Sequence, residues 1–112
     1  MSRFLSIEGR TIELDNEGFL VDLSDWSEQA ARSLGHGEGI AITPAHMEVL
    51  LAVRRFYEQY QLSPAMRPLV KFIGQELGAD KGNSLYLLKL FPGSPAKLVS
   101  KLAGLPKPDN CL

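Results

Sequence analysis

The chain has 112 residues, of which 45% are hydrophobic and 22% are charged, and its net charge is −1. This length suits one domain with a single core, and the composition excludes a chain that is disordered throughout. No apolar run approaches the roughly 18 residues that a membrane span requires, and residues 1–10 lack the apolar core of a signal peptide, so we expect a cytoplasmic location.

The first predicted element is a β-hairpin over residues 5–14. Apolar residues alternate on both sides of Glu8-Gly9, and glycine accepts the positive φ of a tight turn. Two strands alone are marginally stable, so the hairpin must lean on helices. Asp25 and Glu28 then have the spacing of a capping box, which predicts a helix to about Leu34 that the following glycines end.

Three Ser-Pro or Thr-Pro pairs mark the starts of later helices. A hydroxyl can cap the first helical turn, and proline loses no hydrogen bond there because it has no N–H. The pairs are Thr43-Pro44, Ser63-Pro64 and Ser94-Pro95. Apolar residues recurring at three- and four-residue steps then predict helices over 44–60, 64–77 and 95–103, and a shorter one over 84–91. We therefore expect an α+β fold, mostly α, with a small N-terminal hairpin packed on a bundle of about five helices.

The segment after Gly104 differs in character from the rest of the chain. Pro106 and Pro108 forbid a helix and favour an extended, semi-rigid stretch. We expect residues 1–103 to form the single globular domain and residues 104–112 to form a flexible C-terminal arm.

Cys111, on this arm, is the only cysteine in the chain. It cannot form an internal disulfide, and with only His36 and His46 beside it there is no ligand set for a structural zinc. A thiol on an extended arm can enter a partner's active site, and its reactivity rises with the population of the thiolate. Lys101 and Lys107 favour the thiolate, whereas the terminal carboxylate opposes it. Cys111 is therefore the candidate catalytic residue.

The net charge hides a polarity along the chain. Residues 1–53 carry 3 Lys and Arg against 9 Asp and Glu, whereas residues 54–112 carry 9 against 4. The basic half permits a helix-turn-helix interpretation of the two helices joined by residues 61–63. The second of these helices offers only Arg67 and Lys71 as cations, a small footprint for phosphates. A regulatory or nucleic-acid-binding protein stays open as an alternative.

Several segments resemble one known family over nearly the whole chain. The specific ones are "SPAMRPLVK", "DKGNSLYLLKLFP" and "SPAKLVSKLAGLPKP", together with the penultimate Cys111. "LDNEGFL", "DWSE" and "EGIAIT" fit the N-terminal half. On these segments the chain resembles the TusE/DsrC family of small sulfur-relay proteins.

This resemblance implies a mostly helical fold with a small hairpin, and an arm whose penultimate cysteine carries sulfur as a persulfide. The dissimilatory branch of the family, which works with sulfite reductase, has a second cysteine on the arm, and Ser100 occupies that position here. The chain therefore looks closest to the single-cysteine, TusE-like branch. The resemblance implies that sulfur comes from a TusBCD-like complex and goes to an MnmA-like thiouridylase, which makes 2-thiouridine at the tRNA wobble position.

The resemblance also implies which residues support Cys111. Arg67 and Lys71 match basic positions near the family's arm and would hold the anionic tail or the persulfide, with Lys107 as a third cation. Met47 and Leu98 depart from the family's pattern, in which tryptophan and glutamine are usual. Such a relay needs no metal or organic cofactor, and we expect neither a membrane partner nor direct contact with nucleic acid. A DsrC-like carrier in dissimilatory sulfur metabolism stays open as a second alternative.

Overall fold

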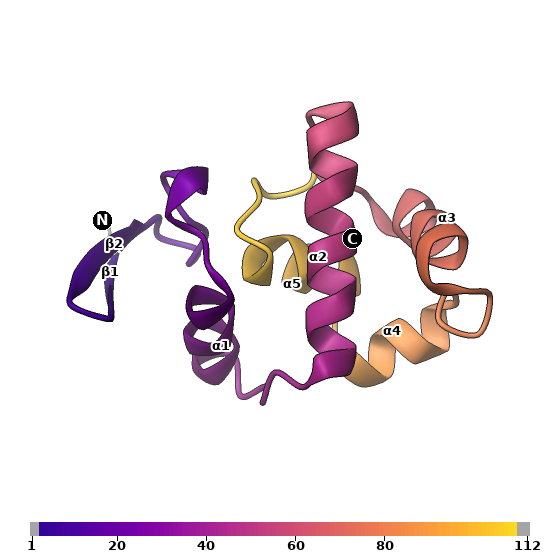
Figure 1. Cartoon of the computed structure of the whole chain (residues 1–112), viewed down its shortest axis with the longest axis horizontal. Coiled ribbons are helices and arrows are strands. Elements are labelled where there is room, and N and C mark those ends of the chain that lie inside the picture. The colour runs from indigo at the N-terminus through magenta and orange to yellow at the C-terminus, as the bar shows by residue number, and fades with distance from the viewer. Residues whose placement is uncertain (1–2, 110–112) are drawn as a thin grey trace.

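The structure of the protein, a computed structural model, describes residues 3–109 (Figure 1). Its elements are, in chain order, β1 (Arg3–Ile7), β2 (Arg10–Leu14), the 3₁₀ helix η1 (Leu23–Asp25), α1 (Glu28–Gly37), α2 (Pro44–Tyr60), α3 (Met66–Leu77), α4 (Ser84–Leu90) and α5 (Pro95–Leu102). The predicted fold class, a small hairpin with a mostly helical bundle, is confirmed. No helix in this described part of the chain is both long and apolar enough to cross a membrane.

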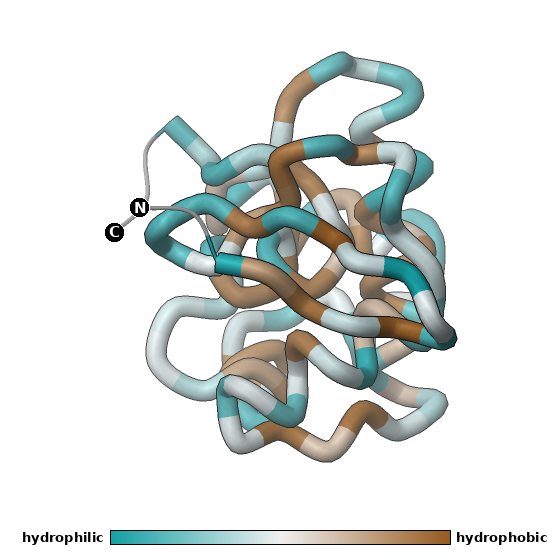
Figure 2. The backbone as a smooth tube through the Cα atoms, turned by 90° about the vertical axis from the view of Figure 1, so that its left-hand side faces the viewer, coloured by the Kyte–Doolittle hydropathy of each residue, from teal (hydrophilic) through white to brown (hydrophobic). Residues whose placement is uncertain are grey.

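The N-terminal hairpin has the predicted turn. Its strands pair antiparallel with Ile7 opposite Arg10. Glu8 and Gly9 between them have φ values of 50° and 80°, and a two-residue hairpin turn of type I′ requires positive φ at both positions. Hydrophobic and hydrophilic residues alternate along the strands that face the viewer in Figure 2. The hairpin packs against α1, which supplies the support that two strands need.

Helix α5 lies at the centre of the bundle although it has only 8 residues. It packs against α1, α2, α3 and α4, and its Val99 and Leu102 side chains are fully buried. The long helix α2 runs beside it, with the hairpin and α1 on one side of α2 and with α3 and α4 on the other (Figure 1). Because the C-terminal segment follows α5 directly, that segment starts from the middle of the molecule.

His46 fixes the N-terminus of α2, the helix that Thr43-Pro44 predicted. The Thr43 hydroxyl accepts from the His46 N–H, and the Thr43 N–H donates to His46 Nδ1 at 3.1 Å. Nδ1 therefore acts as an acceptor, so Nε2 carries the proton and donates to the Leu90 carbonyl at 2.9 Å. The imidazole is buried and meets the Phe91 ring edge-on at 5.2 Å. His46 thus joins the start of α2 to the end of α4, which is a structural role.

Both ends of α1 differ from the prediction. Ser27 caps the helix, whereas Asp25 is the last residue of η1, so the predicted capping box of Asp25 and Glu28 is wrong. The helix also continues past Gly35, which was expected to end it. A Cβ at Gly35 would lie 2.8 Å from the Ile42 side chain, so this glycine permits close packing instead of ending the helix.

Helix α3 begins later than the Ser63-Pro64 pair predicted. Its first residue is Met66, because the Ser63 hydroxyl does not cap it and instead donates to the Pro106 carbonyl at 2.5 Å. Pro68 is the third residue of the helix, where an N–H has no intrahelical acceptor, so proline costs no hydrogen bond there. The predicted Ser63 cap is wrong because this hydroxyl has a tertiary partner that no local pattern indicates.

The acidic and basic halves of the chain pair with one another in the fold. Seven ion pairs occur among residues 3–109, and four of them join a carboxylate from residues 1–53 to a lysine from residues 54–112. These four are Glu48–Lys81, Glu17–Lys97, Glu38–Lys101 and Glu17–Lys107. Much of the charge of the basic half is therefore neutralised inside the molecule.

Candidate functional site

Cys111 lies outside the described residues, so the candidate site is built from the segment that leads to it. Residues 104–109, here called the arm base, are described in full. Cys111 follows Asp109 by two residues, and two residues of chain span at most about 7 Å. The surroundings of the arm base are therefore the part of the body nearest to the thiol along the chain.

The arm base begins with a Schellman turn at the end of α5. Gly104 has a φ of 73°, and its N–H donates to the Lys101 carbonyl at 3.2 Å. The Leu105 N–H reaches back to the Ser100 carbonyl at 2.9 Å, which is the second bond of this motif. Leu105 is 2% exposed and Pro108 is also buried. The arm base thus lies against the body.

The loop between α2 and α3 forms the next contact. Ser63, itself buried, donates its hydroxyl hydrogen bond to the Pro106 carbonyl at 2.5 Å. A pocket of about 190 Å³ opens beside this contact. Its walls come from α2, from the loop and from the arm base: Tyr57, Gln61, Leu62, Ser63, Pro106, Lys107 and Asp109.

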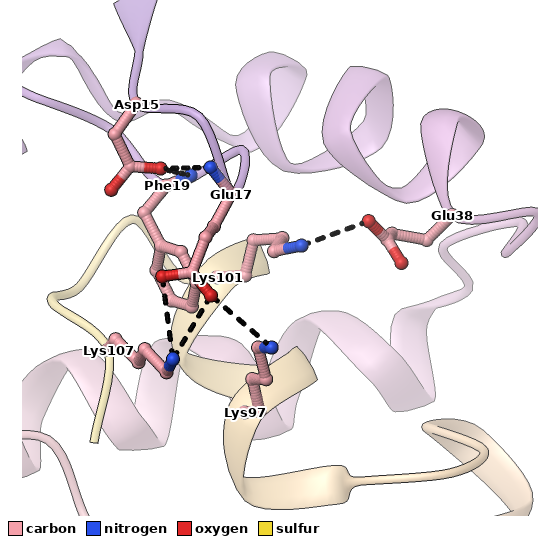
Figure 3. Close-up of polar contacts among 7 residues, drawn as sticks. All are labelled: Asp15, Glu17, Phe19, Glu38, Lys97, Lys101 and Lys107. Atoms are coloured by element: carbon pink, nitrogen blue, oxygen red, sulfur yellow. Dashed lines mark hydrogen bonds and ion pairs between the residues drawn. The ribbon is translucent and has the colours of Figure 1, made fainter. Parts of the chain in front are cut away.

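Glu17 holds the arm base from the opposite end of the sequence (Figure 3). Its carboxylate accepts from Lys107 Nζ at 3.0 and 3.4 Å and lies 3.6 Å from Lys97 Nζ. Asp15 fixes this turn, because its Oδ1 accepts the N–H groups of Glu17 and Phe19 at 2.9 and 3.0 Å. The hydrogen bond from Lys107 is the main cause that lowers the pKa of Glu17. One carboxylate therefore serves lysines of α5 and of the arm base.

Lys101 is also paired with a carboxylate in the structure. Its Nζ lies 3.2 Å from Glu38 and 5.3 Å from the centre of the Phe19 ring. Lys101 and Lys107 were expected to favour the Cys111 thiolate, and both have an acidic partner here. That expectation stays a prediction because Cys111 is outside the described residues.

Arg67 and Lys71 are exposed on α3. Neither makes a hydrogen bond or ion pair with any residue between 3 and 109. Lys71 lines a separate pocket of about 270 Å³ with aromatic side chains of α2 and α3. The predicted support of Cys111 by these two residues is not tested by their surroundings and stays a prediction.

Three further positions singled out in the sequence, Ser100, Met47 and Leu98, lie on the body. Ser100 is fully buried in α5, and its hydroxyl has no hydrogen-bond partner among the described residues. Met47 lines a pocket of about 330 Å³ between α1 and α2, which is distinct from the pocket at the arm base. Leu98 is half-buried and packs against the core. Within residues 3–109, no three His, Cys, Asp or Glu side chains lie close enough together to hold a metal ion.

No local pattern in the sequence indicates Glu17 or Ser63 as contacts of the arm base. Glu17 is 90 residues away from Lys107 and Ser63 is 43 residues away from Pro106. Both belong to short connecting segments, where polar residues are common whether or not they have a distant partner. Tertiary contacts alone identify them.

The Glu17 contact has a predictable dependence on pH. Because pairing with Lys107 lowers the folded-state pKa of Glu17, the contact is fully formed above the ordinary pKa of 4.5 and is lost as the pH falls through the lower, folded value. We expect the NMR titration midpoint of the Glu17 carboxylate to lie below 4.5 and to rise toward it in Lys107→Gln. Lys81→Gln, which breaks the unrelated pair with Glu48, should leave it unchanged. A midpoint that does not respond to Lys107→Gln would contradict the pairing.

Comparisons with known proteins identify the family of the chain. A family model described as DsrC like protein matches residues 6–112. The sulfurtransferase TusE homolog of Haemophilus influenzae is 53% identical over 108 residues, which are 96% of this chain and 99% of that protein. Sulfurtransferase TusE of Escherichia coli strain K12 is 49% identical over the same shares.

Solved structures show the same architecture. The NMR structure of Allochromatium vinosum DsrC is 39% identical, covers both chains completely and superimposes with a TM-score of 0.91. The oxidised gamma-subunit of dissimilatory sulfite reductase, DsrC, from Archaeoglobus fulgidus is 34% identical, covers 98% of this chain and 100% of that chain, and has a TM-score of 0.83. The chain belongs to the DsrC-like protein family.

Proposed function

We propose that this protein is a sulfurtransferase that carries sulfur as a persulfide on Cys111, in a relay that thiolates the wobble uridine of tRNA. The observation that carries the proposal is that the only thiol of the chain follows the arm base of a DsrC-like body. Relatives named sulfurtransferase TusE, about half identical to this chain over 96% of its length, support sulfur transfer as the activity.

The chemistry conserves atoms and electrons at each step. The Cys111 thiolate attacks the outer sulfur of a persulfide on the upstream carrier and forms a new S–S bond. The bond between that outer sulfur and the donor cysteine breaks, and the donor leaves as a thiolate. An acceptor thiolate later attacks the outer sulfur on Cys111 in the same way, which returns Cys111 to its starting state.

A single cysteine suits this chemistry. A second thiol nearby would attack the inner sulfur of the Cys111 persulfide, release sulfide and leave a disulfide, so the sulfur would be lost before it reached the acceptor. Ser100 is fully buried and its hydroxyl has no base beside it among the described residues, so it stays protonated and does not attack as a thiolate would. The second candidate function, a DsrC-like carrier in dissimilatory sulfur metabolism, draws on the similarity to solved DsrC structures, and the serine at this position favours the TusE-like role.

The body predicted over residues 1–103 acts as the scaffold, and the arm predicted over residues 104–112 delivers the thiol to a TusBCD-like donor complex and to an MnmA-like thiouridylase in the cytoplasm. Lys107, Arg67 and Lys71 support the anionic arm or persulfide. The protein supplies no metal or organic cofactor to the reaction.

Intact mass spectrometry tests the proposal directly. The protein is incubated with a cysteine desulfurase, cysteine and a candidate upstream carrier. We expect a gain of one sulfur, about 32 Da, that dithiothreitol removes and that Cys111→Ser abolishes. If the upstream carrier is loaded and the wild-type protein gains no mass, the relay function is wrong, and a regulatory or nucleic-acid-binding role becomes the one to pursue.

A further inference from the structure

Two side chains from distant parts of the sequence hold the end of α5, the point from which the arm base departs. The indole Nε1 of Trp26 donates to the Leu102 carbonyl at 2.8 Å. A guanidinium nitrogen of Arg54 donates to the Ala103 carbonyl at 2.7 Å. The Arg54 guanidinium also stacks on the indole, 4.2 Å from its centre. Trp26 and Arg54 are called the α5 clamp below.

The clamp completes the hydrogen bonding of the helix terminus. The last four carbonyls of an α-helix lack intrahelical partners. Here the Schellman turn provides partners for the carbonyls of Ser100 and Lys101, and the clamp provides them for Leu102 and Ala103. Every carbonyl of the last turn therefore has a donor, which fixes the position of the chain where it leaves α5.

The indole also sets the direction in which the chain leaves. At Gly104, a Cβ would lie 2.5 Å from Trp26 Cδ1, far inside van der Waals contact. The backbone there has a φ of 73°, which glycine adopts without strain. The chain thus turns directly against Cβ, Cγ and Cδ1 of Trp26 before it continues to Leu105.

The surroundings of Arg54 destabilise its charged form. Burial is the main cause that lowers its pKa, and no carboxylate lies within ion-pair distance of it among residues 3–109. Its neighbour Arg55, by contrast, is exposed and pairs with Glu76 at 3.1 Å. The charge of Glu58 favours the charged form of Arg54, but burial outweighs it, because burial removes the cation from water.

We propose that Trp26 and Arg54 are positioning residues for sulfur transfer, which fix the origin and direction of the arm so that Cys111 approaches its partners from a constant point. This inference rests on the proposed function. From this turn onward residues 104–109 are held against the body. A shift of the turn displaces the start of that path, and misplacement of a reacting group by about 1 Å can slow a reaction by about a hundredfold.

Three variants and one matched control test the inference. Trp26→Phe removes the indole N–H and keeps a ring for Arg54 to stack on. Arg54→Met removes the donor and keeps the length of the side chain, and Arg54→Lys restores a cation. Arg55→Met is the control, since it changes the adjacent arginine outside the clamp.

The first readout is amide hydrogen exchange at Gly104 and Leu105, whose N–H groups form the Schellman turn. We expect at least about tenfold faster exchange there in Trp26→Phe and Arg54→Met, with no change at Leu87 in α4. Unchanged exchange at Gly104 and Leu105 in folded variants would overturn the clamp. This readout does not depend on sulfur transfer, so it holds whether or not the proposed function is correct.

The second readout compares two reactions of the thiol. We expect transfer from the loaded upstream carrier to Cys111 to slow about tenfold in Trp26→Phe and Arg54→Met. Arg54→Lys should recover part of the rate, and Arg55→Met should keep the wild-type rate. The reaction of Cys111 with the small disulfide 5,5′-dithiobis(2-nitrobenzoic acid) should keep its wild-type rate, because a small reagent needs no positioned arm.

The outcomes separate the two proposals. The positioning role is wrong if the variants exchange faster at Gly104 and Leu105 but transfer sulfur at the wild-type rate. It is also wrong if their reaction with the small disulfide slows as much as their reaction with the carrier. A wild-type protein that takes no sulfur from the loaded carrier would overturn the proposed function, and the positioning role with it. If Arg54→Met does not fold, Trp26→Phe carries the test, since it leaves the charge and the stacking in place.

Discussion

Cys111→Ser is expected to abolish sulfur transfer completely while leaving the unfolding temperature unchanged. The chain has one cysteine, so no other thiol can take over as the nucleophile. A serine hydroxyl stays protonated at neutral pH, whereas a thiol is partly ionised and is intrinsically far more nucleophilic. Among the described residues, the hydrophobic core extends from Ile7 to Leu105, and we expect serine at position 111 to leave the stability of this core unchanged.

Transfer is measured as incorporation of sulfur into the downstream acceptor in the reconstituted relay. The control adds Ser84→Cys to the Cys111→Ser protein. Ser84 is exposed at the start of α4, so this double variant has an accessible thiol on the body and none on the arm. We expect it to remain inactive, because a thiol on the body cannot enter a partner's active site. Wild-type transfer by Cys111→Ser would show that Cys111 is not the carrier, and wild-type transfer by the double variant would show that the thiol need not lie on the arm.

Phe91→Ala is expected to reduce the free energy of unfolding by about 3–5 kcal/mol, the usual cost of removing a buried phenylalanine ring. Phe91 has no exposed surface and ends α4 with its N–H on the Leu87 carbonyl. Its ring meets the buried imidazole of His46, so the substitution leaves a cavity between the start of α2 and the end of α4. The whole free energy of unfolding of a small domain is roughly 5–15 kcal/mol, so this variant should be close to unfolding at moderate temperature.

Urea unfolding followed by circular dichroism measures this effect. Leu85→Ala is the matched control, because Leu85 lies on α4 and is 72% exposed. We expect that substitution to change the free energy of unfolding by less than about 0.5 kcal/mol. Equal destabilisation by the two substitutions would contradict the burial of Phe91 in the core.

Local patterns predicted those elements whose partners are near in sequence. The hairpin follows from a two-residue turn between alternating strands, and α2 follows from Thr43-Pro44, because a cap and its helix lie within one turn of each other. Ser63-Pro64 has the same pattern and was predicted wrongly. Its hydroxyl bonds to Pro106 instead, and a local pattern cannot distinguish a capping hydroxyl from one with a distant acceptor.

The charge polarity of the chain shows the same limit. Composition predicted an acidic half and a basic half, which left open a basic surface for nucleic acid. In the fold, Lys97, Lys101 and Lys107 all pair with carboxylates from the first half. Charges attract over distances set by the fold and not by sequence separation, so only the folded chain determines which cations keep an acidic partner.

By itself, the sequence determined the fold class, the family resemblance and the identity of the one possible thiol nucleophile, because each depends on residue type or on neighbours within a few positions. Only the tertiary structure decided what surrounds the arm base and the end of α5. Trp26 and Arg54 bind the end of α5, Ser63 binds Pro106, and Glu17 binds Lys107. These contacts join residues that are 43 to 90 positions apart. Each depends on the packing of several helices around α5, which brings together in space groups that no local sequence pattern relates.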